Sequence, residues 1–173
     1  DQRQHIEITR DIAERFNSRF GETFIIPQHV IPTAGARVMD LQHPERKMSK
    51  SETSTNGTIN VLEPVDNVRK KIKRAVTDSD NEILFDFDKK PGVSNLLSIL
   101  GASTGQKPSE VAKTYDRYGD LKAATADAVV ELLEPIQQRF AELQSDPGET
   151  RRLLQIGAEK AQEIASQTLE RAK

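Results

Sequence analysis

Mostly apolar residues near the start of the chain recur at steps of three and four positions. The series is Ile6, Thr9, Ala13, Phe16 and Phe20. Such spacing puts side chains on one face of a helix, so it predicts a helix over residues 1–20. Gly21 follows at a position where helices commonly end, and Asp1 is a carboxylate of the kind that caps a helix N-terminus.

The following segment alternates short apolar runs with prolines. Residues 23–26 and 29–31 are two such runs, and each is followed by a proline. Residues 36–41 form a third run centred on two apolar side chains. All three are predicted to be short strands, with the prolines limiting their pairing. Residues 42–60 have no apolar period and many Ser, Thr, Lys and Glu residues, which predicts a long loop of the kind that is often functional.

From Pro64 onward the apolar period is helical to the end of the chain. Gly101 is expected to end the second of these helices, and Pro135 to kink or break the fourth. Small residues along the last helix would let a neighbouring helix approach closely. The predicted helices cover residues 64–76, 93–100, 108–118, 121–143 and 147–173.

The change from a mixed to a helical pattern near residue 62 predicts the domain organisation. Residues 1–62 are too few for a doubly wound sheet and would form only the end of an α/β domain. Residues 63–146 would form an all-α domain, and residues 147–173 a C-terminal helix that packs back toward the first part. The expected fold class is therefore mostly α. Because residue 1 is not Met and a helix begins at once, we expect the chain to be part of a longer protein.

The composition limits the classes of site that the chain can carry. A net charge of -2 predicts no attraction of nucleic acid to the whole surface, so any RNA must bind a local basic patch. The absence of cysteine excludes disulfides and thiolate metal sites and is consistent with a cytoplasmic protein. His5, His29 and His43 lack metal-ligand spacing, and no apolar run is long enough for a membrane helix.

The residues with the clearest chemical meaning are Lys47-Met48-Ser49-Lys50-Ser51, inside the predicted loop. Lysine carries a point charge on a flexible stem, so two lysines on a mobile loop can meet the oxygens of a triphosphate. When a carboxylate attacks the α-phosphate, charge builds up on the departing pyrophosphate, and such cations stabilise the transition state. Serine hydroxyls and backbone amides add hydrogen bonds to phosphate. The alternative is a solvated charged loop.

This pentapeptide is identical to the second signature of class I aminoacyl-tRNA synthetases, and further segments extend the resemblance. Asp1, Gln2 and His5 resemble the end of a Gly-x-Asp-Gln-x-x-His segment of the tryptophan and tyrosine members. Other segments resemble the bacterial tryptophanyl branch, and the likeness runs from residue 1 to about residue 140. These are residues 35–39, 72–79 and 91–97.

The resemblance implies a Rossmann catalytic domain, a helical anticodon-binding domain, and a homodimer that ligates tryptophan to tRNA(Trp) using ATP with Mg²⁺. It implies that Asp1 contacts the ATP ribose, that Gln2 lies near the amino acid, and that Val38 meets adenine through its backbone. The phosphates would be held by Lys47, Met48, Ser49, Lys50 and Ser51. Lys50 would have the largest catalytic effect, followed by Lys47. The alternatives are a plain N-cap for Asp1 and core packing for Val38.

The resemblance is incomplete. The first signature of the family, a His-Ile-Gly-His-like motif, does not occur in the chain, and neither does the segment that recognises the indole. We therefore expect the chain alone to be inactive. Residues 69–74 are a basic run that would suit an RNA backbone or form an ordinary solvated helix face. Two other interpretations stay open: a non-catalytic, synthetase-like tRNA-binding module, and a tyrosyl-tRNA synthetase.

Overall fold

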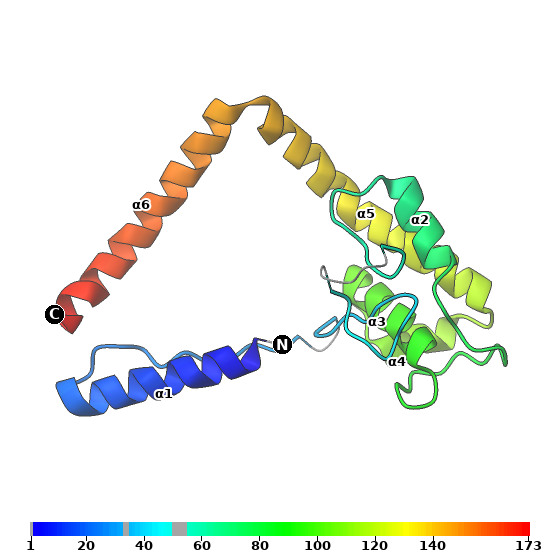
Figure 1. Ribbon diagram of the computed structural model, residues 1–173, viewed down its shortest axis with the longest axis horizontal. Coiled ribbons are helices and arrows are strands. Elements are labelled where there is room, and N and C mark those ends of the chain that lie inside the picture. The colour runs from blue at the N-terminus through cyan, green and yellow to red at the C-terminus, as the bar shows by residue number, and fades with distance from the viewer. Residues whose placement is uncertain (1, 33–34, 50–54) are drawn as a thin grey trace. The chain divides into compact units, whose positions relative to one another are not determined.

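The computed structural model describes residues 2–32, 35–49 and 55–173. Within these ranges the regular elements are helices, and none of the helices is long and apolar enough to cross a membrane (Figure 1). The chain divides into two compact units. One contains residues 32–140, and the other contains residues 1–31 and 141–173. The expected boundaries at residues 62 and 146 concern functional domains, and they stay a prediction.

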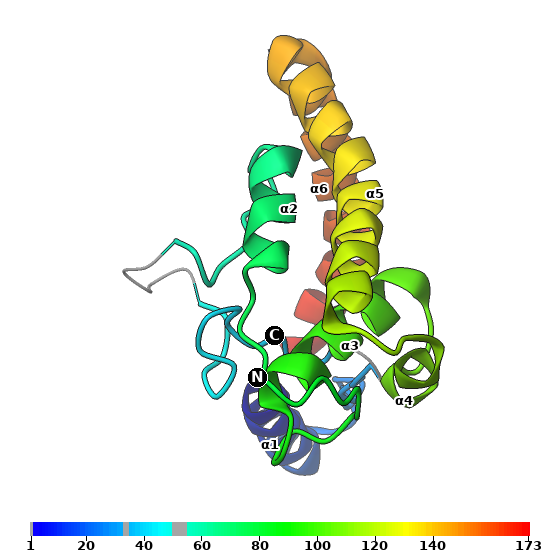
Figure 2. The ribbon, with the colours of Figure 1, turned by 90° about the vertical axis from the view of Figure 1, so that its right-hand side faces the viewer.

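The unit of residues 32–140 is built around one buried helix. This helix, α3 (Pro91–Thr104), is buried at every position from Gly92 to Gly101 because apolar side chains surround it. α2 (Val65–Lys73) contributes Val68 and Ile72, both fully buried, to the same core. α5 (Tyr118–Ser145) contributes its N-terminal part, and Figure 2 shows α2 and α5 lying side by side. The remaining elements are α4 (Pro108–Val111) and the 3-10 turn η1 (Ala112–Thr114).

Two glycines are required where α3 meets its surroundings. A Cβ on Gly92 would lie 2.1 Å from the carbonyl oxygen of Val76, and one on Gly101 would lie 2.7 Å from that of Gln106. Gly101 therefore lies inside the helix for steric reasons, and the prediction that it ends the helix was wrong. α3 ends at Gly105, whose φ of 71° is left-handed.

The other unit contains α1 (Arg3–Phe20), the extended segment that follows it, and α6 (Pro147–Ala172). α1 ends at Gly21, as predicted. The side chain of Asn17 accepts hydrogen bonds from the backbone amides of Thr23 and Phe24 and donates one to the carbonyl of Phe24. α6 begins, as predicted, after Asp146, whose carboxylate accepts a hydrogen bond from the amide of Glu149 at 2.9 Å.

Two predictions for the helices need correction. The helix expected over residues 108–118 is only one turn of α4 followed by η1, since the chain turns extended at Tyr115 before α5 begins at Tyr118. Pro135 does not break α5, which continues through it; the other expected outcome, a kink at Pro135, stays a prediction. Just after the proline, the side-chain amide of Gln137 donates hydrogen bonds of 2.8 Å from Nε2 to the backbone carbonyls of Val61 and Glu63.

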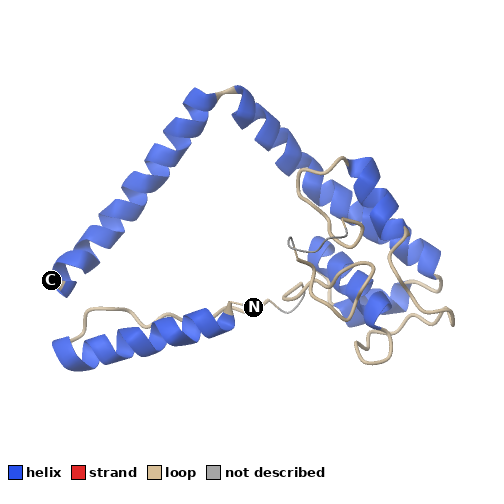
Figure 3. Cartoon of the chain, in the orientation of Figure 1, coloured by secondary structure: helices blue, strands red, loops and turns tan. Residues whose placement is uncertain are grey.

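The three predicted strands, at residues 23–26, 29–31 and 36–41, are absent from the described part of the chain (Figure 3). Only an isolated antiparallel bridge between Met39 and Lys47 remains. An extended segment becomes a strand when a neighbouring backbone satisfies its amides and carbonyls. Here side chains do so instead, namely Asn17 for Phe24 and Asn95 for Met39.

Candidate functional site

The segment before the lysine loop is held in place by the core helix. The amide of Met39 donates to Oδ1 of Asn95 at 2.9 Å, and the carbonyl of Met39 accepts from Nδ2 of Asn95 at 2.8 Å. Asn95 is 1% exposed and lies on α3. Its amide group therefore serves Met39 as a neighbouring strand would. The other edge of this segment faces the lysine loop, because Val38 accepts a hydrogen bond from the amide of Met48 at 3.0 Å.

A buried carboxylate shapes the turn into the loop. Asp40 accepts hydrogen bonds from the amides of Gln42 and His43, at 2.7 and 2.9 Å, as in an Asx-type turn. Gly57 lies against the same carboxylate, since a Cβ there would come within 2.0 Å of its oxygens. The amide of Leu41 also donates to the carbonyl of Gly57 at 2.9 Å. Both ends of the loop are thus fixed to one another at Asp40 and Gly57.

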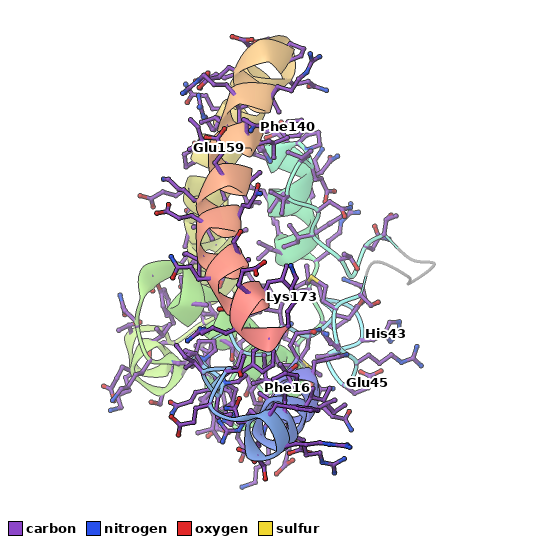
Figure 4. The ribbon with its side chains drawn as sticks, turned by 90° about the vertical axis from the view of Figure 1, so that its left-hand side faces the viewer. Phe16, His43, Glu45, Phe140, Glu159 and Lys173 are labelled. Atoms are coloured by element: carbon purple, nitrogen blue, oxygen red, sulfur yellow. The ribbon has the colours of Figure 1, made fainter. Side chains whose placement is uncertain are left out.

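The outer turn of the loop is polar and exposed. Nδ1 of His43 lies 3.5 Å from a carboxylate oxygen of Glu45, and both side chains are more than half exposed (Figure 4). The amide of Arg46 donates to the carbonyl of His43, and the amide of Asp40 donates to the carbonyl of Arg46. These contacts form a tight turn that returns the chain to Lys47.

The returning chain borders an open cavity of about 630 Å³. Lys47 is exposed, while Met48 and Ser49 are half-buried and Met48 packs against the core. The hydroxyl of Thr58 donates to the carbonyl of Ser49 at 3.2 Å, which ties the two walls together. The cavity is lined by Ala36, Arg37, Val38, Lys47, Met48, Ser49, Thr58, Ile59, Asn60, Val61 and Leu62.

Four of the predicted site residues therefore border one cavity: Val38, Lys47, Met48 and Ser49. Asp1, Lys50 and Ser51 lie outside the described residues. Gln2 is the exposed residue before α1 and belongs to the unit of residues 1–31 and 141–173, so it is described apart from the cavity. The roles of all eight residues stay predictions.

Sequence reasoning did not identify Asp40, Asn95 and Gly57 as the residues that position the loop. Asn95 lies within a segment that carried the family resemblance, but its amide had no recognisable role without a partner. Asp40 and Gly57 are distant in the sequence and meet only because the loop closes.

The basic run of residues 69–74 occupies the last part of α2 and its C-cap, Arg74, and its cations differ in their surroundings. The side chain of Lys71 is only 12% exposed; its Nζ lies 2.7 Å from a carboxylate oxygen of Glu63 and donates to the carbonyl of Thr58 at 2.8 Å. Arg69 pairs with Asp127 of α5. The patch is thus not a uniform solvated face, since part of it stabilises the wall of the cavity.

A second ionic cluster lies where α3 and α5 begin. Nζ of Lys90, which is 5% exposed, donates to Asp78 at 3.0 Å and to Asp80, and the hydroxyl of Tyr118 bonds to both acids. Burial lowers the pKa of Lys90, but its hydrogen bonds with Asp80 and Asp78 outweigh this and raise the pKa above its ordinary value. Burial and the neighbouring Asp78 raise the pKa of Tyr118. The network fixes the acids in place, so they are structural.

Comparison with known proteins shows the family of the chain. Residues 1–134 match the family described as tRNA synthetases class I (W and Y). The chain is 48% identical to tryptophan–tRNA ligase 1 of Streptomyces coelicolor over 172 residues, which is 99% of the chain and 51% of that protein. The chain therefore spans about half the length of this curated relative.

Solved structures show the same relationship. The crystal structure of tryptophanyl-tRNA synthetase from Mycoplasma pneumoniae aligns with a TM-score of 0.87 and 36% identity, over 98% of this chain and 52% of that one. The Campylobacter jejuni tryptophanyl-tRNA synthetase, complexed with ADP and tryptophane, aligns with a TM-score of 0.61 and 27% identity over the same shares. The match to the family profile extends over most of the chain, and the chain therefore belongs to the class I tRNA synthetases of the tryptophan and tyrosine group.

Proposed function

We propose that the chain supplies the ATP-binding loop and the helical part of a tryptophan–tRNA ligase. The observation that carries the proposal is the cavity bordered by Val38, Lys47, Met48 and Ser49. These residues come from the two antiparallel segments joined at Met39 and Lys47. The relatives named above are tryptophan enzymes, and one of them was solved with ADP and tryptophane.

In this proposal the cavity accepts the nucleotide. The half-buried Met48 and the backbone of Val38 form an apolar edge suited to a planar base. Lys47 borders the same cavity, and in this proposal the phosphates extend toward it. The carboxylate of tryptophan attacks the α-phosphate, pyrophosphate leaves, and the adenylate is formed. Lys50 and Lys47 stabilise the charge that develops on the leaving group, and Mg²⁺ enters with ATP as part of the substrate.

The remaining assignments follow from the same proposal. Asp1 binds the ribose and Gln2 the amino-acid side of the site. Ser49 and Ser51 donate hydrogen bonds to phosphate. Residues 63–146 contact the anticodon of tRNA(Trp), and the whole protein acts as a cytoplasmic homodimer. The chain alone lacks the first signature of the family, so we expect no activation by residues 1–173 in isolation.

The test is amino-acid-dependent exchange of pyrophosphate into ATP by the full-length protein. Exchange should depend on tryptophan. Lys50→Ala should lower the exchange rate by about 100-fold, as expected for a cation that acts on transition-state charge, and leave the dissociation constant of tryptophan nearly unchanged. Lys107→Ala removes an exposed lysine outside the site and serves as the matched control.

Three results would contradict the proposal or part of it. Exchange that depends on tyrosine would assign the protein to the tyrosyl branch. Absence of exchange with either amino acid, together with retained tRNA binding, would favour a non-catalytic RNA-binding module. An equal loss of tryptophan binding and exchange in Lys50→Ala would show that the loop is structural.

A further inference from the structure

A second cavity, of about 650 Å³, lies behind the wall of residues 55–63 and against α2. Its lining is unlike that of the first cavity because it is dominated by basic and amide side chains. The residues that line it are Gln42, Thr55, Asn56, Asn60, Leu62, Glu63, Asn67, Lys70, Lys71 and Arg74.

The charge balance of this cavity is positive. Glu63 is the one carboxylate among the described residues that line it; Glu63 forms an ion pair with Lys71, and both side chains are about nine-tenths buried. Lys70 lies in the last turn of α2 and Arg74 is the residue that caps its C-terminus; both are exposed, and no described carboxylate pairs with either. Among the residues that the structure describes, nothing compensates these two positive charges. The amides of four surrounding Asn and Gln residues add hydrogen-bond donors.

The cavity is connected to the lysine loop by hydrogen bonds. Nζ of Lys71 donates to the carbonyl of Thr58 at 2.8 Å, and the hydroxyl of Thr58 donates to the carbonyl of Ser49 at 3.2 Å. Asn60 and Leu62 line both this cavity and the one beside the loop. An anion near Lys71 would compete with Glu63 for the ammonium group of Lys71. This competition would alter the hydrogen bonds that connect Lys71 through Thr58 to Ser49.

We infer that this cavity binds a phosphate group through Lys70 and Arg74, and that its occupancy is transmitted to the lysine loop through Lys71 and Thr58. Guanidinium and ammonium groups with flanking amide donors suit the tetrahedral oxygens of phosphate. Binding of the anion restrains the wall of residues 55–63, which the two cavities share.

The source of the phosphate is the backbone of an RNA strand. The net charge of -2 provides no general attraction, so RNA requires a local cationic site of this kind. The amides lining the cavity suit the 2′-hydroxyls and base edges that accompany RNA phosphates. This choice of RNA rests on the proposed function, whereas the affinity for phosphate depends only on the cavity.

The experiment measures binding of a tRNA transcript and, separately, of inorganic phosphate and pyrophosphate to residues 1–173. One variant is Lys70→Ala/Arg74→Ala. The matched control is Lys73→Ala/Lys107→Ala, which removes two exposed cations that do not line this cavity. Both variants change the net charge equally, so a general electrostatic effect would be the same in both.

The expected result is that the cavity variant weakens tRNA binding at least tenfold, since two charge-assisted hydrogen bonds are lost. Its slope of log affinity against log salt should fall by about 1.4 to 1.8 units. The control variant should change affinity by less than about threefold, as expected for solvated charges. Amide hydrogen exchange in residues 55–63 should slow on binding in the parent chain but not in the cavity variant.

Equal weakening by the two variants would overturn the proposal, because binding would then follow net charge. Tight binding of inorganic phosphate or pyrophosphate that tRNA does not displace would make a small anion the ligand and reject RNA. Binding without slower exchange in residues 55–63 would refute the coupling to the loop. Each outcome differs from a failure of the proposed function, which is judged by tryptophan-dependent exchange in the full-length protein.

Discussion

Replacing Asn95 with alanine gives the sharpest test of how the lysine loop is positioned. The change removes both hydrogen bonds to the backbone of Met39, a residue only 8% exposed. The opposite edge of this segment is occupied, because its neighbours pair with Arg46 and Met48. Neither group of Met39 has another described partner. Asn95→Ala therefore leaves one amide and one carbonyl buried and unsatisfied.

The size of the effect follows from these two groups. A buried backbone group left without a partner costs about 1–3 kcal/mol, so the pair costs about 2–6 kcal/mol. Because the stability of a domain is about 5–15 kcal/mol, this loss is a large fraction of the total. With a urea slope of about 1–2 kcal/mol/M, the unfolding midpoint should fall by at least about 1 M.

Tyrosine fluorescence during urea unfolding measures the stability of the unit of residues 32–140, which contains Asn95. The chain has two tyrosines and no tryptophan, and Tyr115 and Tyr118 both lie in the unit of residues 32–140. Asn67→Ala is the matched control, since Asn67 is an exposed asparagine on α2 and its loss should cost less than about 0.5 kcal/mol. If Asn95→Ala lost no more stability than Asn67→Ala, the amide would not be what holds Met39.

Two further predictions concern the packing of α3 and the ionic cluster beside it. Gly92→Ala should strongly destabilise the unit of residues 32–140, because its Cβ would overlap the backbone carbonyl of Val76. Gly119→Ala should stabilise α5 by up to about 1 kcal/mol, because a Cβ there has nothing within 4 Å. Thermal melts that show the same change in melting temperature for the two variants would contradict this prediction. Hydrogen bonds with Asp78 and Lys90 hold the pKa of Asp80 well below its ordinary 3.8, so its contribution to stability is present at neutral pH and is lost as the pH falls below about 4. Lys90→Met should therefore reduce the dependence of the melting temperature on pH between 5 and 2, and an unchanged acid dependence would refute the role of that ion pair.

The parts of the fold that were predictable depend on local information. The periodic helices at residues 3–20, 65–73 and 147–172 were found because each follows its own apolar spacing and its own terminal signals. The long loop was found because it lacks such spacing. The pentapeptide that begins at Lys47 was found because its residue types have a chemical meaning without any structural context.

The parts that failed depend on contacts between distant residues. The strands were wrong because an extended segment needs a partner, and Met39 has the side chain of Asn95 as its partner. Gly101 was predicted to end a helix because glycine commonly follows the last helical turn. Glycine is also required where another backbone comes close, and that is its role at position 101. The partial burial of Lys71 could not be predicted either, because Glu63 and Thr58 approach it only in the folded chain.

The use of asparagine amides in place of neighbouring strands has a consequence for chemical ageing. Asn17 and Asn95 each donate from the side-chain nitrogen to a backbone carbonyl, at 2.8 Å in both cases. Hydrolysis of either amide would replace that donor with an anionic oxygen facing a carbonyl oxygen, and attraction would become repulsion. Asparagine is among the residues that heat degrades first. Prolonged storage at high temperature should therefore release the segment after α1 if Asn17 is hydrolysed, and should destabilise the whole unit of residues 32–140 if Asn95 is hydrolysed.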